Sequence, residues 1–148
     1  MDKIKIVVVG GGWGGCAAAI AAVKAGAEAV LLERTDMLLG TGLVGGIYRN
    51  NGRQTAAEEM TALGGGDLFH VMDECAGHEN IEFPGHAHAS LYNVYEIEPA
   101  VKKYLISLGV KVVTGASAMK IDKKEGKMIS VTARDGAVYE ADAFASSV

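Results

Sequence analysis

The first 33 residues constrain the fold more than any other segment, because they combine a strand, a glycine loop, a helix and a second strand in a fixed order. Residues 3–9 (KIKIVVV) form an apolar run rich in β-branched side chains, which predicts a strand buried on both faces of a parallel sheet. An alanine-rich helix is expected over about 14–25, and Gly26 should end it. The apolar run 27–32 then predicts a second parallel strand that ends at Glu33.

The glycine loop between the first strand and the helix has the spacing G-x-G-x-x-G, with Gly10, Gly12 and Gly15 at its three positions. In this pattern the first glycine permits a tight turn, the second lets the backbone approach a pyrophosphate, and the third allows close packing of helix on sheet. The helix N-terminus adds free N–H groups and a partial positive charge. The GGGWGG loop therefore predicts a site for the diphosphate of a dinucleotide, with Trp13 and Gly14 as further candidate contacts.

Glu33 lies 18 residues beyond Gly15, where a carboxylate accepts hydrogen bonds from the ribose hydroxyls of a dinucleotide and repels a 2′-phosphate. A glycine pattern alone is weak evidence, because the chain has 20 glycines among 148 residues. Here the strand, helix, second strand and acidic residue all stand in the required order. A glycine-rich βαβ unit without a ligand is the alternative interpretation.

Two residues near the loop have open roles. Cys16 is expected to be a small buried residue in the first helical turn, although a helix N-terminus can also lower a thiol pKa and make it reactive. Trp13 either covers the cofactor or only shields the start of the helix.

Composition favours one soluble globular domain over residues 1–148, with 49% apolar residues, 22% charged residues and a net charge of −4. This charge argues against binding nucleic acid or an anionic membrane. Cys16 and Cys75 are the only cysteines, so no disulfide framework is indicated and a cytoplasmic location is expected. The glycine loop interrupts the N-terminal apolar run and excludes a signal peptide, and no run approaches the roughly 18 apolar residues of a membrane span.

Residues 35–98 are expected to form a loop and short helices. Glycines recur over 40–52 without a sustained period, which predicts an ordered loop beside the ligand, with a flexible surface connection as the alternative. The apolar side chains between Met37 and Ile47 argue against full exposure. Two short helices are predicted, at about 55–63 and from an N-cap at Asp67 to about Ala76.

The segment 75–88 (CAGHENIEFPGHAH) contains Cys75, His78, His86 and His88, all potential metal ligands. Their spacing matches no strong zinc pattern, so we assign no metal site here. A polar loop is the preferred interpretation, in which a histidine could exchange a proton with a substrate. No residue of the chain is assigned as catalytic.

Residues 99–148 predict a helix, a strand and an antiparallel meander. The helix begins at Pro99 and ends before Gly109, with apolar residues on one face, and 110–113 form a third buried strand. Strand-like segments at 117–122, 128–134 and 138–141 are separated by the lysine-rich stretch 123–127 and by a turn at Asp135-Gly136.

These segments together resemble the N-terminal FAD-binding part of FAD-dependent oxidoreductases with a glutathione-reductase-like flavin domain. The resemblance rests on VVVGGGWGGCAAAIAAVKAGAEAVLLER, on LLGTGLVGGI and on EPAVKKYLISLGVKVVTGA with the meander, and covers nearly the whole chain. It implies an α/β, Rossmann-like, three-layer domain with a parallel sheet and an antiparallel meander, with nucleotide half-site 3–34, loop and short helices 35–98, and helix, strand and meander 99–148.

The resemblance also implies FAD as the cofactor, since classical NAD-binding dehydrogenases have a helix where this chain has the meander. Gly10, Gly12 and Gly15 would contact the pyrophosphate, and Glu33, followed by Arg34, would contact the adenosine. The loop Gly40, Thr41 and Gly42 would follow the cofactor towards the flavin, and 112–115 would pass near the adenine.

Family members continue beyond the last strand of this chain into a substrate domain and a segment that completes the flavin site. The chain is therefore expected to be incomplete, either a fragment or a small subunit. We expect a homo-oligomer or a partner subunit to complete the site, and an unidentified small-molecule substrate. The alternatives are an NAD-binding domain of a dehydrogenase and a non-catalytic dinucleotide-binding or assembly module.

Overall fold

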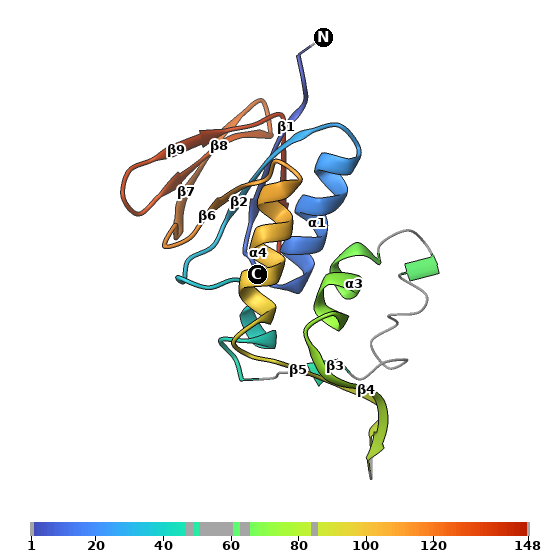
Figure 1. Ribbon diagram of the computed structural model, residues 1–148. Coiled ribbons are helices and arrows are strands. Elements are labelled where there is room, and N and C mark those ends of the chain that lie inside the picture. Colours follow the sequence, from blue (N-terminus) through green and yellow to red (C-terminus); the bar gives the residue numbers. More distant parts are fainter. Residues whose placement is uncertain (1, 47–48, 51–60, 63–65, 84–85, 148) are drawn as a thin grey trace.

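A computed structural model describes residues 2–46, 49–50, 61–62, 66–83 and 86–147. In chain order its elements are β1 (Lys5–Val9), α1 (Trp13–Lys24), β2 (Glu28–Leu32), the 3₁₀ turn η1 (Gly40–Gly42), β3 (Arg49–Asn50), α3 (Asp67–Asp73), β4 (Ala76–Phe83), β5 (His86–Tyr92), α4 (Ile97–Ser107), β6 (Lys111–Val113), β7 (Ala118–Lys124), β8 (Lys127–Ala133), β9 (Val138–Glu140) and β10 (Ala143–Ser146). Figure 1 shows their arrangement.

The central sheet contains four parallel strands in the order β10-β1-β2-β6. Strand β1 lies between β2 and β10, with Ile6 opposite Ala29 on one side and Ala143 on the other. Because both faces of the sheet are covered at β1, with Val8 in one apolar cluster and Val7 in the other, its KIVVV sequence can be apolar on both sides. The predicted parallel sheet is confirmed.

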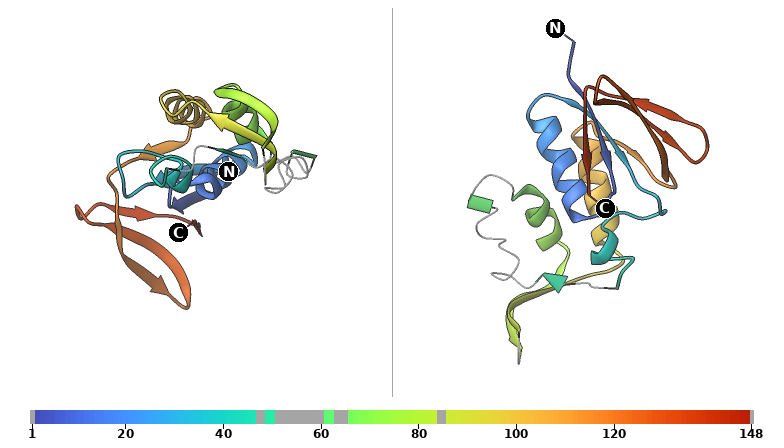
Figure 2. Two further views of the ribbon diagram at one scale, coloured as in Figure 1. Left: turned by 90° about the horizontal axis from the view of Figure 1, so that it is seen from below. Right: turned by 180° about the vertical axis from the view of Figure 1, so that it is seen from behind.

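Side chains alternate between the two faces of this sheet. Val8 and Leu31 pack in the cluster that includes α1 and α4, whereas Val7 and Leu32 pack with Val131 of the meander. The helices cover one face and the β7-β8-β9 meander covers the other, and Figure 2 shows these layers on opposite sides of the sheet. The predicted three-layer α/β fold is confirmed.

Helix boundaries differ from the sequence prediction at one place in α4. The helix begins at Ile97, so Pro99 is its third residue and not its first. The proline remains compatible with the helix because N–H groups of the first turn have no intrahelical acceptor. The C-terminal ends of both long helices agree with the prediction. Gly26 follows α1 and Gly109 follows α4, each with φ of +90°, as expected of glycines that end helices.

Helix α3 is shorter than predicted, and its N-cap is Gly66. Asp67, predicted as the N-cap, is the first helical residue and pairs with Lys24 of α1, with Nζ and Oδ2 2.6 Å apart. The ion pair thus joins α3 to the C-terminal end of α1. The other short helix, predicted at 55–63, falls almost entirely outside the described residues.

The segment 75–88 is not the polar loop expected from its sequence. Ala76–Phe83 and His86–Tyr92 form the antiparallel strands β4 and β5, and β3 pairs with the other edge of β5. Figure 1 shows this small sheet extending away from the central one, below α3. The side chains of His78, His86 and His88 lie outside the described part of the structure.

Candidate functional site

The glycine loop joins β1 to α1 in a tight turn at the carboxyl end of the central sheet. Gly10 has φ of +99°, a conformation that favours glycine, and its N–H donates to the carbonyl oxygen of Leu32 at 2.8 Å. A Cβ on Gly15 would overlap the carbonyl oxygen of Gly10, so this glycine lets α1 approach the strand. A Cβ on Gly12, in contrast, would meet no atom within 4 Å. Gly12 therefore faces open space, and Gly15 serves packing.

The first-turn backbone N–H groups of helix α1, which have no intrahelical acceptor, lie at this loop. Its N-cap is Gly12, which has no side chain for capping, and no acidic residue lies in the first turn. The N–H of Cys16 donates to the carbonyl oxygen of Gly12 at 2.9 Å, so the N–H groups of residues 13–15 precede the intrahelical ladder. They give this end of the helix a partial positive charge that suits an anion.

Glu33 follows β2 and is 6% exposed. One carboxylate oxygen, Oε2, accepts the Gly11 N–H at 2.7 Å. The other, Oε1, accepts the N–H of Thr35 at 2.8 Å and is 2.9 Å from the Thr35 Oγ1, which also lies 2.7 Å from the carbonyl oxygen of Met37. The carboxylate thus fixes the glycine loop against the segment that leaves β2.

Residues that follow β6 close the other side of this segment. The N–H of Ala116 donates to the carbonyl oxygen of Glu33, and the N–H of Gly115 donates to that of Thr35, both at 2.8 Å. These bonds hold the backbone after β6 beside the backbone after β2. The site wall there is formed by 116–118, slightly beyond the 112–115 segment that the family resemblance suggested.

The turn η1 lies beside the glycine loop. The N–H of Leu39 donates to the carbonyl oxygen of Gly11 at 2.7 Å, and Leu39 and Gly40 have φ of +71° and +46°. Leu38, Leu39 and Leu43 are buried, so the 37–47 loop is ordered against the core where it is described, and Val44 is exposed. The surface-connection alternative is wrong for this described part.

These elements enclose a cavity of about 770 Å³, a volume within the range of cofactor sites. It is lined by Val9, Gly10, Gly12, Leu32, Glu33, Arg34, Thr35, Gly40, Thr41, Val44, Gly45, Ala116, Ser117, Ala118 and Ser147. Strand ends, the helix N-terminus and η1 therefore converge on one cavity at the carboxyl edge of the parallel sheet, the usual place for a ligand in open α/β sheets.

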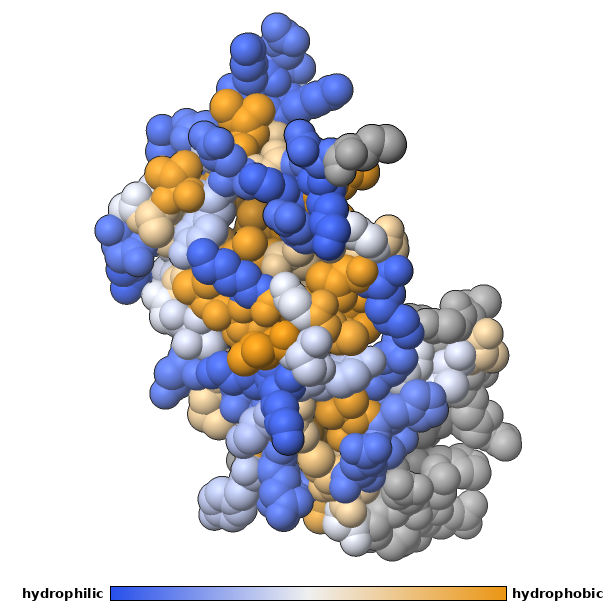
Figure 3. Space-filling model, turned by 45° about the horizontal axis from the view of Figure 1, so that its top comes forward, coloured by the Kyte–Doolittle hydropathy of each residue, from blue (hydrophilic) through white to orange (hydrophobic). Residues whose placement is uncertain are grey.

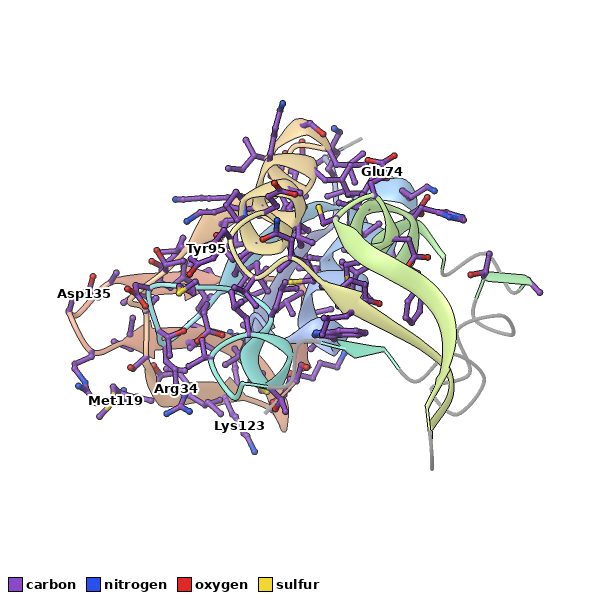
Figure 4. The ribbon with its side chains drawn as sticks, turned by 60° about the horizontal axis from the view of Figure 1, so that its bottom comes forward. Arg34, Glu74, Tyr95, Met119, Lys123 and Asp135 are labelled. Atoms are coloured by element: carbon purple, nitrogen blue, oxygen red, sulfur yellow. The ribbon has the colours of Figure 1, made fainter. Side chains whose placement is uncertain are left out.

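Six of the ten sequence-predicted binding residues line this cavity, namely Gly10, Gly12, Glu33, Arg34, Gly40 and Thr41. Trp13, Gly14, Gly15 and Gly42 do not line it. Arg34 is exposed and, in the view of Figure 4, lies on the meander side with Met119 and Lys123 of β7, away from Glu74.

Several of the lining residues that sequence reasoning missed follow β6 and β10. Ser147 reaches the cavity because β10 pairs with β1 and its N–H donates to the Val9 carbonyl oxygen at 2.9 Å. Thr35 could have been found from its position two residues beyond Glu33, where a hydroxyl reaches the carboxylate. Ala116, Ser117 and Ala118 carry no chemical signal in the sequence.

The open roles of Cys16 and Trp13 are resolved by their surroundings. Cys16 is fully buried, and burial, together with the charges of Glu33 and Glu98, raises the pKa of its thiol to about 12 despite a backbone hydrogen bond from Leu39 that lowers it. The reactive-thiol alternative is therefore wrong. Trp13 packs away from the cavity, against Phe69 and Tyr92.

Among the residues that the structure describes, no helix is long and apolar enough to cross a membrane. Within the same residues, no group of three or more His, Cys, Asp or Glu side chains gathers into a metal site.

Comparison with known proteins agrees with this architecture. A family model described as glucose inhibited division protein A matches residues 5–146. GidA of Aquifex aeolicus is 16% identical over 98% of this chain and 25% of its own, with a TM-score of 0.70. The Diels-Alderase PyrE3 of the pyrroindomycin pathway is 22% identical over 97% of this chain and 32% of its own, with a TM-score of 0.67. The tetrameric form of 2-methyl-3-hydroxypyridine-5-carboxylic acid oxygenase is 20% identical over 97% and 39%, with a TM-score of 0.63.

At these identities the three structures show a shared fold, and the chain spans between 25% and 39% of their lengths. No curated protein sequence matches it. The family match has more weight because it extends over almost all of the chain and identifies an FAD-binding region, with FAD as the cofactor. The chain belongs to the glucose inhibited division protein A family.

Proposed function

We propose that the cavity holds the adenosine diphosphate half of FAD, and that the chain is the cofactor-binding part of a flavin-dependent oxidoreductase. The observation that carries this proposal is the convergence of Gly12, the α1 N-terminus and Glu33 on one cavity of about 770 Å³. Gly12 and the α1 N-terminus suit the diphosphate, and Glu33 suits the ribose.

The diphosphate would lie over Gly10 and Gly12 at the start of α1. The empty space where a Gly12 Cβ would stand allows an oxygen-rich group to approach the backbone, and the helix N-terminus offers N–H donors without a competing acidic side chain. Gly40 closes this position from the other side, since its own added Cβ would be 3.4 Å from the Gly12 Cα. The donor set therefore fits a diphosphate.

The ribose would bind at Glu33. A carboxylate has about four acceptor positions, and Oε2 accepts one bond from Gly11 in this structure, so it retains capacity for a ribose hydroxyl. Oε1 is more fully engaged with Thr35, and we expect it to orient the carboxylate. The adenine would lie beyond the ribose, between Arg34 and 116–118. A 2′-phosphate placed against this buried acidic group would be repelled.

When bound, FAD supplies the redox chemistry, while this chain binds and orients the cofactor. Gly40 and Thr41 would follow it towards the flavin, and residues outside the present chain would complete the flavin and substrate sites. A partner surface is in keeping with Figure 3, which shows apolar residues gathered across the middle of one face. The substrate, the electron partner and the catalytic residues belong to that larger assembly, which we expect to act in the cytoplasm.

The test is calorimetric titration of the purified chain with FAD, NAD and ADP, supported by native mass spectrometry. If a full flavoprotein binds FAD at about nanomolar affinity and this chain retains half of that free energy, the expected Kd is some tens of micromolar, about 30 μM. FAD and ADP should both bind. Binding of NAD with no binding of FAD would instead support the dehydrogenase alternative, and no binding of any nucleotide by the folded chain would support the non-catalytic module.

The variant Gly12→Ala makes this test specific. Gly12→Ala should leave the fold intact, because the added methyl group meets open space and Gly12 has an extended backbone with φ of −68°. It should nevertheless weaken FAD and ADP binding by about tenfold or more, because the methyl group occupies the place of a phosphate oxygen. Unchanged affinity in a folded Gly12→Ala chain would contradict the diphosphate assignment.

A further inference from the structure

Trp13 follows two residues of the glycine loop that line the cavity, Gly10 and Gly12, but its own side chain turns away from the cavity. It is the first residue of α1 and directly follows Gly12. Its ring lies 6.1 Å from that of Phe69 on α3, at 74°, and 5.9 Å from that of Tyr92 on β5, at 58°. Aromatic rings in such tilted arrangements attract one another, so Trp13 is held by two elements distant in sequence.

The indole also supports the turn that lines the cavity. A Cβ built on Gly42 would overlap Nε1 of Trp13, and the next nearest atoms are Cε2 at 2.7 Å and Cδ1 at 3.0 Å of the same ring. The three closest atoms to this position therefore all belong to Trp13. Gly42 is buried, and the two residues preceding it in η1, Gly40 and Thr41, line the cavity.

Backbone hydrogen bonds close this turn, from the Gly42 N–H to the Leu39 carbonyl oxygen and from the Leu43 and Gly45 N–H groups to that of Gly40, but its position also depends on neighbouring residues. Leu39, a residue with a Cβ, enters it at φ of +71°, a conformation that costs free energy unless the surroundings impose it. The Leu39–Gly11 hydrogen bond anchors the entrance of the turn, whereas the Gly42 end rests on the indole. Nε1 of Trp13 is buried with no hydrogen-bond partner among the described residues. The indole therefore supports Gly42 through van der Waals contact.

We propose that Trp13 is a positioning residue of the cofactor site. Its indole fixes the position of the Gly40–Gly42 turn and thereby shapes the cavity wall along which the flavin-side half of FAD would lie. The inference rests on the proposed function for the location of FAD. Gly42 is glycine because the indole occupies the space of its side chain. The ring contacts with Phe69 and Tyr92 fix the indole, so the packing of α3 and β5 determines the shape of a cavity that neither element lines.

A double-mutant cycle between Trp13 and Gly42 tests this inference. Gly42→Ala should displace the turn and weaken FAD binding by about tenfold, since the methyl group meets a ring held on its other side. The same substitution in a Trp13→Ala background should change FAD affinity by less than about twofold, because the obstructing ring is gone. Equal losses in both backgrounds would overturn the proposal.

ADP separates a positioning role from a general structural role. The Gly40 end of the turn borders the diphosphate that ADP shares with FAD, whereas the rest of the turn would follow the flavin-side half that ADP lacks. Gly42→Ala and Trp13→Leu should therefore weaken FAD binding by about fivefold more than they weaken ADP binding. Equal weakening of both ligands would mean that Trp13 merely stabilises the fold, and would overturn the proposal. If Gly42→Ala does not yield folded protein, Trp13→Leu alone decides through this comparison.

Trp13 is the only tryptophan of the chain, so its fluorescence gives a second readout. Gly42→Ala should shift the emission of the unliganded chain, because the methyl group moves against the ring, whereas the control Gly12→Ala should not. An unshifted spectrum would contradict the contact. If the proposed function itself is wrong, Gly12→Ala will fail to weaken FAD binding, while the Trp13–Gly42 contact will still appear in the emission spectrum.

Discussion

Replacement of Glu33 tests the fold and the site together, because one buried carboxylate serves both. In Glu33→Ala the buried N–H of Gly11 loses its acceptor, at a cost of about 1 to 3 kcal/mol, and the half-buried N–H of Thr35 adds about 1 kcal/mol. We therefore expect the free energy of unfolding to fall by about 2 to 4 kcal/mol, a large part of the stability of a small domain.

Urea unfolding followed by circular dichroism measures this loss as a lower midpoint with an unchanged slope. Glu33→Gln is the matched control, because it keeps the side-chain volume and one carbonyl acceptor and should lose about half as much. Thr35→Val removes only the hydroxyl contact and should have a still smaller effect. A Glu33→Ala midpoint equal to that of the parent would refute the role of the carboxylate in holding the glycine loop.

Titration with ADP, at a temperature where every variant is folded, measures the second role. Loss of the ribose hydrogen bond in Glu33→Ala should weaken binding by about 1 to 3 kcal/mol, which corresponds to about 5-fold to 150-fold. A destabilised variant that binds ADP as well as the parent would confine Glu33 to a structural role and contradict the ribose assignment.

Three further predictions follow from packing and charge. Gly15→Ala should lower the free energy of unfolding by about 3 kcal/mol in urea, because its methyl group overlaps the Gly10 carbonyl oxygen, and a stability equal to that of Gly12→Ala would contradict this packing. Burial raises the pKa of Cys16 to about 12. Folding stability should therefore fall by about 1.4 kcal/mol per pH unit above about pH 9, because the thiol ionises first in the unfolded chain. Cys16→Ala should remove this contribution to the alkaline slope, and an identical slope in the variant would refute the raised pKa. Glu98 accepts the Leu38 N–H at 3.3 Å; Glu98→Ala, but not Glu98→Gln, should speed hydrogen exchange at Leu38, and unchanged exchange would exclude the bond.

The N-terminal strand, glycine turn, helix and second strand could be predicted from sequence because their signals are local. The strand, the turn at Gly10, the helix and Glu33 follow one another within a short stretch, and each has a residue type that its conformation requires. The meander was equally accessible, since β7, β8 and β9 match their predicted segments within a few residues. Short-range chemistry determined these elements.

Features that depend on contacts between distant segments could not be predicted in the same way. Trp13 sits in the loop by sequence, but its orientation depends on Phe69 and Tyr92, which no local pattern connects to it. Asp67 is a residue type that commonly forms an N-cap, yet its carboxylate pairs with Lys24. The hairpin of β4 and β5 was missed because polar residues obscure strand alternation, although the Pro-Gly sequence at 84–85 is a turn signal.

The pairing of β1 with β10 has a consequence for how the chain acquires its structure. The Lys5 N–H donates to Asp142 across a separation of 137 residues, so the first strand finds this neighbour only after nearly the whole chain is available. Ribosomal synthesis proceeds at about 5 to 20 residues per second, and contacts of such long range also slow the conformational search. On the ribosome, one edge of β1 should therefore stay unpaired for about 7 to 27 seconds, and during that interval it would be accessible to chaperones.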